Sequence, residues 1–322
     1  MTDYTTVQAN SLLENDLRAL VRLSIAEDLR SSVDWTTVCL IDPDRRGVCE
    51  VVPRDVGVCA GLATLAWIVD EFDADLEGEC FQSDTSELSP NRPIAKLSGN
   101  ARDLVTCERT LLNILSRLCG IATLTRAYVD AIGSSKARLY DTRKTTPGWR
   151  LLEKYAVHCG GGHNHRSGLY DGFLIKDNHL ALAGPSSTGP SSTGPSTTGP
   201  AGRPLSAREG AERAIAWRGA TVEHLMAPEI VEIEVDSLDQ FRDVIETTPD
   251  IVLLDNFTIE QLREAVAIRD AAKVRIELEA SGNVRLGTIA EIATTGVERI
   301  SCGALTHQAT SLDLGLDWIG EQ

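Results

Sequence analysis

The spacing of apolar residues changes near residue 138. Before it, apolar positions recur every three or four residues in 12–29 and 104–132, as on one face of a helix, and short β-type runs broken by Gly and Pro occur in 47–61. After it, short apolar runs alternate with helical stretches. The expected strands are RLYDT, GFLIKD, IVEIEVDS, IVLLDN, VRIELEASG and ERISCGA, starting at residues 138, 172, 230, 251, 274 and 298. This alternation predicts an α/β fold with a parallel sheet, and about six units favour an α/β barrel over an open doubly wound sheet.

One segment has neither pattern. Residues 184–200, GPSSTGPSSTGPSTTGP, repeat a five-residue unit that contains no large apolar residue and no charge. Such a segment cannot bury apolar surface, so we expect a mobile surface loop over residues 184–204. A docking tail is the less favoured alternative, and we assign the segment no chemistry.

Polar residues stand at the C-terminal end of every expected strand. In chain order they are Asp141, Arg143 and Lys144, then Lys176, Asp177 and Asn178, then Glu234 and Asp236, then Asp255 and Asn256, then Glu279, Ser281 and Gly282, and finally Gly303. In barrels and in doubly wound sheets alike, ligands bind at this edge. We therefore expect a functional site there.

The local charge at these positions opposes that of the whole chain, whose formal net charge is −16. Residues 138–179 contain seven Lys or Arg, four Asp or Glu, and four of the six His. Arg and Lys hold carboxylates and phosphates, so this excess predicts a small polyanion as ligand. Glu234 and Asp255 end neighbouring strands, and carboxylates completed by water and substrate phosphate are the usual Mg²⁺ ligands. The site thus has a cationic part and an acidic part. Both are explained if an anionic substrate binds beside a second substrate whose phosphates are bound to Mg²⁺.

Composition narrows the class of protein. The eight Cys form no C-x-x-C pair, which disfavours a disulfide framework or zinc site and fits a reducing cytosol. No 18-residue apolar run and no secretory signal is evident, so we expect a cytoplasmic protein without a membrane span. No basic face indicates nucleic-acid binding. Only 6 of the 31 basic residues are Lys, and such an acidic, Lys-poor composition resembles that of halophile proteins, with an ordinary acidic enzyme as the alternative.

Eight ordered motifs carry a resemblance to a known family: ERTLLN…LCGIAT, DTRKTTPG, GGGHNHRSGL, IKDNH, EIEVDS, LLDNF, EASGN and CGALTH. Together they resemble quinolinate phosphoribosyltransferase, or nicotinate-nucleotide pyrophosphorylase (carboxylating), a type II phosphoribosyltransferase. The resemblance implies an N-terminal α/β sandwich domain over 1–118, a C-terminal α/β barrel over 119–306, and a tail, 307–322, that packs back on the first domain. It also implies Mg²⁺ as cofactor, and a homodimer with shared active sites that in some members assembles further, to a hexamer.

The reaction that the resemblance implies is part of de novo NAD biosynthesis. Quinolinate and phosphoribosyl pyrophosphate give nicotinate mononucleotide, pyrophosphate and CO₂. Carried over by motif, the residues that hold the two quinolinate carboxylates are Arg143, His165, Arg166 and Lys176. The expected catalytic residues are Lys144, between the two substrates, and Glu234 and Asp255, which face the ribose and Mg²⁺-pyrophosphate. Those expected at the phosphates are Ser281, Gly282 and Gly303, with His307 nearby, while Arg109 would reach the site of the partner subunit.

Two departures from the family pattern and two rival functions stay open. His163 stands where GGGxNHR usually has a small apolar residue, and the repeat lengthens a connection that is normally short. We expect structural roles for His163 and His179. The rivals are an enzyme of the same fold acting on another pyridine or pyrimidine acid, and a small-molecule binder without catalytic activity.

Overall fold

The computed structural model describes residues 3–183 and 204–321, which divide into two compact units. The barrel unit contains residues 3–5, 130–143, 164–183 and 204–302, and the antiparallel unit contains residues 6–129, 144–163 and 303–321. The repeat expected to form a surface loop lies outside the described residues.

Six parallel strands form the sheet of the barrel unit. They are β6 (Arg138–Tyr140), β7 (Phe173–Ile175), β10 (Val231–Val235), β11 (Ile251–Asp255), β12 (Glu277–Ser281) and β13 (Arg299–Ser301). Their order is β6-β13-β12-β11-β10-β7, and every neighbouring pair is parallel. Each strand predicted from an apolar run is present, so the predicted α/β fold with a parallel sheet is confirmed.

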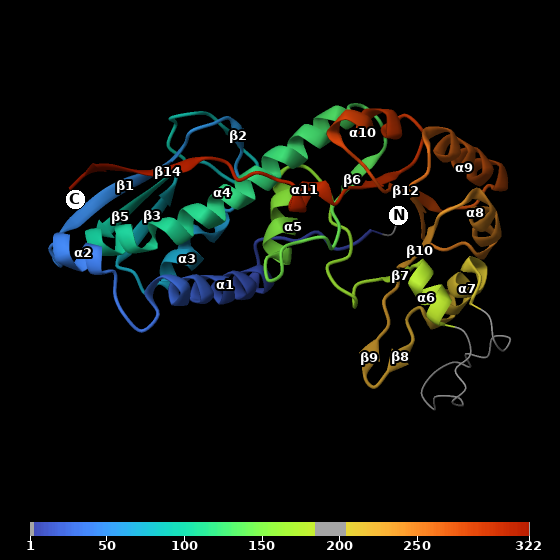
Figure 1. The fold of residues 1–322 in the computed structure, drawn as a ribbon, viewed down its shortest axis with the longest axis horizontal. Coiled ribbons are helices and arrows are strands. Elements are labelled where there is room, and N and C mark those ends of the chain that lie inside the picture. The colour runs from blue at the N-terminus through green and yellow to red at the C-terminus, as the bar shows by residue number, and fades with distance from the viewer. Residues whose placement is uncertain (1–2, 184–203, 322) are drawn as a thin grey trace. The chain divides into compact units, whose positions relative to one another are not determined.

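Helices follow these strands and cover the outer face of the sheet (Figure 1). They are α6 (Asp177–Leu182), α7 (Ala207–Trp217), α8 (Leu238–Val244), α9 (Ile259–Ala272) and α10 (Leu286–Ala293), with a 3₁₀ turn, η2 (Ile245–Thr247), and a small hairpin, β8 (Thr221–Val222) and β9 (Leu225–Met226). Ser206, Ser237 and Thr258 begin α7, α8 and α9, and each side chain accepts a hydrogen bond from a backbone N–H in the first turn. These N-caps accept from backbone N–H groups that have no partner within the helix. They therefore fix the residue at which each helix begins and the preceding loop ends.

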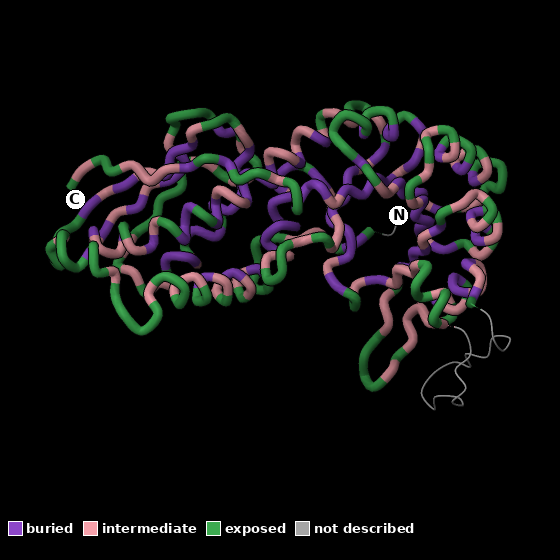
Figure 2. Tube along the Cα trace, in the orientation of Figure 1, coloured by how far each residue is buried: buried purple, intermediate pink, exposed green. Residues whose placement is uncertain are grey.

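Charged side chains fill the inside of this sheet. Glu232, Glu279 and Arg299 have no exposed surface. The strands that carry them, β10, β12 and β13, are mostly buried (Figure 2). His165 Nε2 lies 3.0 Å from Glu232 on β10 and 3.5 Å from Glu279 on β12, two strands that are not neighbours. One ring reaches both carboxylates because the sheet curves around it, as in a barrel. Among the described residues no pairing joins β6 to β7, so the barrel is open between them.

An antiparallel sheet of order β14-β1-β5-β3 is the centre of the second unit. Its strands are β1 (Arg46–Pro53), β3 (Leu76–Cys80), β5 (Ala95–Asn100) and β14 (Leu314–Gly320), and a short ladder joins β2 (Gly57–Val58) to β4 (Glu87–Leu88). Its helices are α1 (Ser11–Leu29), α2 (Trp35–Leu40), η1 (Leu62–Thr64), α3 (Leu65–Glu71), α5 (Arg150–Cys159) and α11 (Ala304–His307). Helix α4 (Ala101–Ile132) begins in this unit and ends in the barrel unit. The domain boundary expected near residue 118 lies inside α4 and stays a prediction.

Two further features concern both units. No helix in residues 3–183 or 204–321 has the length and apolar content needed to span a membrane. The eight cysteines are free thiols, of which Cys39 and Cys80 are exposed. Burial raises the pKa of the Cys107 and Cys159 thiols to about 12, so both stay protonated and unreactive near neutral pH.

Candidate active site

The predicted site residues are divided between the two units. The barrel unit contains Arg143, His165, Arg166, Lys176, Glu234, Asp255, Ser281 and Gly282, and the antiparallel unit contains Arg109, Lys144, Gly303 and His307. Within each unit the structure shows which of them meet.

Two arginines of the barrel unit, Arg143 and Arg166, act on each other through their charges. Arg143 follows β6, and Arg166 lies in the segment that leads to β7. Burial, and next to it the positive charge of Arg143, lower the pKa of Arg166. Arg166 Nη1 donates to the Gly172 carbonyl at 3.0 Å, whereas its buried Nε has no hydrogen-bond partner among the described residues. Two like charges held together repel each other, and a bound anion would remove this cost.

A third cation is paired with a carboxylate from the next strand. Lys176 follows β7, and its Nζ forms an ion pair with Glu234 Oε2 on β10. The backbone N–H of Lys176 donates to His179 Nδ1 at 2.9 Å, which gives His179 the structural role expected from the sequence. Two residues expected to bind different substrates are thus bonded to each other.

Asp255, Ser281 and Gly282 come together where β11 and β12 end. Asp255 is the register partner of Ser281, and Asn256 Nδ2 donates to Asp255 Oδ2 at 2.7 Å. Gly282 has a φ of +90°, and a Cβ there would collide with Asn256 Oδ1. Only glycine fits this position without strain, so the strand ends present backbone rather than side chain.

Lys144, Gly303 and His307 converge in the antiparallel unit. Thr306 Oγ1 donates to the Lys144 carbonyl at 2.7 Å. A Cβ on Gly303 would lie 2.9 Å from Lys144 Cδ and 3.4 Å from the His307 ring. Gly303, which has no side chain, therefore leaves the space in which the Lys144 side chain lies.

Arg109, the remaining predicted residue of this unit, is on α4. Its side chain is 68% exposed, and its guanidinium lies 3.7 Å from Glu108.

Asp141, at the end of β6, holds the segment that carries His165 and Arg166. Its Oδ1 accepts from the His165 backbone N–H at 2.8 Å, and its Oδ2 accepts from Asn164 Nδ2 at 2.7 Å. The Arg166 N–H donates to His165 Nδ1 at 2.8 Å, so the proton of the ring lies on Nε2, which faces Glu232 and Glu279. Both ring nitrogens of His165 are therefore engaged by protein groups.

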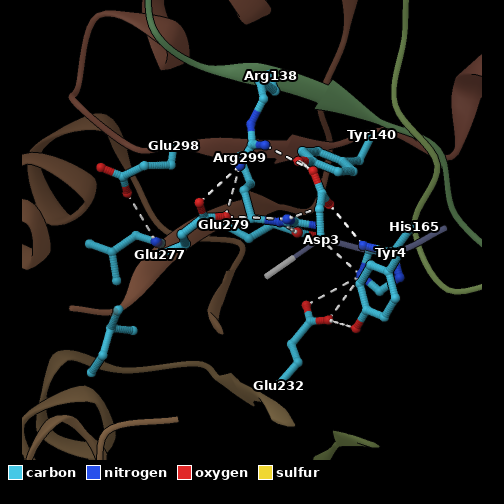
Figure 3. Close-up of polar contacts among 12 residues, drawn as sticks. Asp3, Tyr4, Arg138, Tyr140, His165, Glu232, Glu277, Glu279, Glu298 and Arg299 are labelled. Carbon is cyan, nitrogen blue, oxygen red and sulfur yellow. Dashed lines mark hydrogen bonds and ion pairs between the residues drawn. The ribbon is translucent and has the colours of Figure 1, made fainter. Parts of the chain in front are cut away.

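The carboxylates around His165 belong to a buried network that sequence reasoning missed (Figure 3). Tyr4 donates its hydroxyl to Glu232 Oε2 at 2.8 Å, and Arg299 Nε donates to Glu279 Oε2 at 2.8 Å. Burial raises the pKa of Glu279, whereas for Glu232 the contacts with His165, Arg299 and Tyr4 outweigh burial and lower the pKa. Glu232 and Glu279 were detectable as charges in apolar strands, whereas nothing in the sequence marks Tyr4.

This network is also the one group of His and carboxylate ligand atoms within 4.8 Å of one another in the described chain: His165, Glu232 and Glu279. The hydroxyl of Tyr4 and the guanidinium of Arg299 already use oxygens of the two carboxylates, and Arg299 supplies the compensating charge. The arrangement is therefore that of an ion-pair network rather than a metal centre. Glu234 and Asp255 lie apart from this network, at the ends of β10 and β11.

Comparison with known proteins decides the family. The family described as "Quinolinate phosphoribosyl transferase, C-terminal domain" matches residues 121–189 and 210–317, and the corresponding N-terminal domain matches residues 34–119. The chain belongs to the quinolinate phosphoribosyltransferase family. Both halves of the family's domain organisation are therefore present in order.

Similar proteins cover nearly the whole chain. The nicotinate-nucleotide pyrophosphorylase [carboxylating] of Mycobacterium leprae is 39% identical over 303 residues, which are 93% of this chain and 96% of that protein. A probable enzyme of the same name from Bacillus subtilis is 35% identical and covers 83% of this chain and 82% of its own length. The structure of the Francisella tularensis nicotinate-nucleotide pyrophosphorylase has a TM-score of 0.81 at 32% identity, covering 99% of this chain and 100% of that chain. The similarity thus includes both units and all the motifs above.

Proposed function

We propose that this protein transfers the phosphoribosyl group of phosphoribosyl pyrophosphate to quinolinate with decarboxylation, giving nicotinate mononucleotide, pyrophosphate and CO₂ in de novo NAD biosynthesis. The observation that carries the proposal is that Arg143 acts on the buried Arg166: burial, and next to it the positive charge of Arg143, lower the pKa of Arg166. A chain of net charge −16 that keeps two arginines within electrostatic reach of each other is suited to binding a dianion. Quinolinate has its two carboxylates on adjacent ring carbons.

Arg143, His165, Arg166 and Lys176 are the residues proposed to hold quinolinate. The positive charges of Arg143, Arg166 and Lys176 offset the mutual repulsion and desolvation of the two carboxylates. Lys176 is ion-paired with Glu234, so a quinolinate carboxylate would compete with Glu234 for its ammonium group. Binding of quinolinate therefore changes the surroundings of a carboxylate proposed for the second substrate.

Glu234 and Asp255 are proposed to face the ribose and to hold Mg²⁺, directly or through water. The donor set fits this ion, because two carboxylates end the neighbouring strands β10 and β11 and substrate phosphate supplies further oxygens. When bound, Mg²⁺ neutralises charge on the leaving pyrophosphate. Ser281, Gly282, Gly303 and His307 are proposed for the phosphate groups, with Lys144 as the cation next to both substrates.

The chemistry requires no side-chain nucleophile. The quinolinate ring nitrogen attacks ribose C1 as pyrophosphate leaves, and the carboxylates of Glu234 and Asp255 stabilise the positive charge that develops on the ribose. Ribosylation makes the ring an electron sink, so the carboxylate next to the nitrogen is lost as CO₂. The protein's contribution is to position two anions and to stabilise charge.

We further propose a cytoplasmic homodimer with shared active sites. Arg109 has the exposure needed to reach a partner subunit, with its side chain 68% exposed on α4. Light scattering tests the dimer. Mixing an Arg109→Ala subunit with an Arg143→Ala subunit tests the sharing, because a mixed dimer regains one complete site.

The deciding experiment measures CO₂ and nicotinate mononucleotide formed from quinolinate, phosphoribosyl pyrophosphate and Mg²⁺. Product that depends on all three components supports the proposal. Turnover of nicotinate in place of quinolinate would favour the rival function of an enzyme of the same fold that acts on another pyridine acid. Tight binding of quinolinate without product, by a folded protein, would favour the non-catalytic binder.

A further inference from the structure

Residues Asp3 and Tyr4 belong to the barrel unit although they precede every helix and strand. Tyr4 is 5% exposed and clusters with Ile230 and Ile251, which stand at the amino ends of β10 and β11. Asp3 accepts hydrogen bonds from Arg138 at 2.8 Å, from Tyr140 at 2.9 Å and from Arg299 at 3.1 Å (Figure 3). The segment is therefore fixed inside the amino end of the barrel, opposite the strand ends at which Lys176, Glu234 and Asp255 lie.

Tyr4 contacts His165 in two ways. Its ring stacks on the imidazole with the centroids 4.7 Å apart and the planes at 26°. Its hydroxyl donates to Glu232 Oε2, and the same oxygen lies 3.0 Å from His165 Nε2. Burial and the Glu232 charge raise the pKa of Tyr4 far above its ordinary value, so the hydroxyl stays a donor at any working pH.

Glu232 is the carboxylate that fixes the imidazole. Of the groups that face the ring, Glu279 is hydrogen-bonded to Arg299 and lies farther away, at 3.5 Å, and Tyr4 is bonded to Glu232. Glu232 thus accepts from Tyr4 on one side and from His165 on the other. Buried networks of this kind are rigid, because each lost hydrogen bond leaves a buried polar group without a partner.

The position of the imidazole passes directly to Arg166. His165 Nδ1 accepts from the Arg166 N–H at 2.8 Å, so rotation of the ring releases the backbone that carries the Arg166 guanidinium. Since both ring nitrogens are engaged, the ring acts on quinolinate through Arg166. We propose that Tyr4 and Glu232 are positioning residues that hold the His165 ring, and through it Arg166, in the orientation that binds quinolinate. The inference rests on the proposed function.

Tyr4→Phe in the full chain is the main test, because it keeps the stacked ring and removes only the hydroxyl. We expect the KM for quinolinate to rise roughly tenfold, the size typical of one lost hydrogen bond to a charged group. The KM for phosphoribosyl pyrophosphate and kcat stay within about twofold, because a displaced Arg166 weakens binding of one substrate only. Glu232→Gln, which breaks the same link from the other side, gives the same selective rise.

Tyr155→Phe is the matched control. Tyr155 donates to Asp84 at 2.5 Å in the antiparallel unit, so this variant also removes a tyrosine–carboxylate hydrogen bond, here a partly buried one that does not contact His165. We expect a similar loss of thermal stability with both KM values unchanged. Equal changes in both KM values for Tyr4→Phe, or none, would reduce Tyr4 to a structural role and overturn the inference. Absence of turnover by the unmodified protein would overturn the proposed function, and this inference with it.

Discussion

Lys176 Nζ is bonded to Glu234 Oε2 across the ends of the neighbouring strands β7 and β10. The cation proposed for quinolinate and the carboxylate proposed for the ribose and Mg²⁺ are thus each other's partners. On the proposed roles, each substrate competes with the ion pair for one of its members. The pair would then couple quinolinate binding to the environment of the second substrate.

Glu234→Gln separates the effect of Glu234 on quinolinate binding, through Lys176, from its proposed role in catalysis. The lysine side chain is 41% exposed, and exposed ion pairs contribute only about 0.2–1 kcal/mol, so releasing Lys176 improves quinolinate affinity by at most about fivefold. Loss of the carboxylate that stabilises the transition state lowers kcat by about 100-fold. Calorimetric titration with quinolinate and steady-state kinetics measure the two effects.

Glu264→Gln is the control for this variant, since Glu264 is ion-paired with Arg242 at 2.6 Å on the outer helices. We expect Glu264→Gln to leave both the quinolinate affinity and kcat unchanged. A tenfold weaker affinity for quinolinate in Glu234→Gln would contradict the coupling and place Glu234 at the quinolinate itself.

Arg143→Ala tests the dianion site. Removing one of two neighbouring guanidinium groups costs quinolinate binding about 1.5–3 kcal/mol, or roughly 10- to 100-fold in KM. The Arg143 charge, which after burial is the next cause that lowers the pKa of Arg166, also disappears, and thermal unfolding verifies that the fold is kept. Arg263→Ala, an exposed arginine of α9, leaves KM unchanged. Equal losses of quinolinate and phosphoribosyl pyrophosphate affinity in direct binding assays would refute the assignment.

Gly303→Ala tests the placement of Lys144. The backbone of Gly303 has a φ of −69°, which alanine adopts without strain, so the added methyl group meets only the side chains of Lys144 and His307. Displacing Lys144 by about 1 Å lowers kcat/KM for phosphoribosyl pyrophosphate roughly 10- to 100-fold. Circular dichroism and thermal unfolding verify that the fold is kept.

Gly287→Ala provides the comparison, because a Cβ at this position of α10 meets nothing within 4 Å. Alanine there raises stability slightly and leaves kinetics unchanged. If Gly303→Ala also leaves kcat/KM unchanged, the position of the Lys144 side chain does not depend on the missing side chain at Gly303.

Much of the site was predictable because the carboxyl ends of parallel strands meet at one edge. Once β7, β10, β11 and β12 are assigned from their apolar runs, the residues that follow them must approach one another, as the Lys176–Glu234 pair shows. Tyr4 and His165, which are far apart in the sequence, come together through the fold, and no periodicity marks such a contact. Strand β3 was not predicted, because LEGEC is mostly exposed and lacks the alternation of apolar and polar residues that is typical of a strand.

Removal of Mg²⁺ tests the role of Glu234 and Asp255. Excess EDTA abolishes product formation but leaves quinolinate binding intact, because the proposed quinolinate residues are cations rather than metal ligands. Asp255→Asn raises the Mg²⁺ concentration needed for half-maximal activity by about tenfold or more, since a neutral amide binds the ion less strongly. Activity that persists in EDTA, with the metal content verified by mass spectrometry, would argue against a metal requirement.

Salt dependence distinguishes a halophile protein from an ordinary acidic one. With a net charge of −16, self-repulsion opposes folding at low ionic strength, and the screening length falls from about 10 Å at 0.1 M to about 3 Å at 1 M salt. We expect the thermal midpoint to rise by several degrees between 0.1 and 2 M KCl. Stability is the informative measurement, because salt also weakens binding of two anionic substrates and so raises both KM values. A midpoint that does not change with KCl would favour the ordinary acidic enzyme.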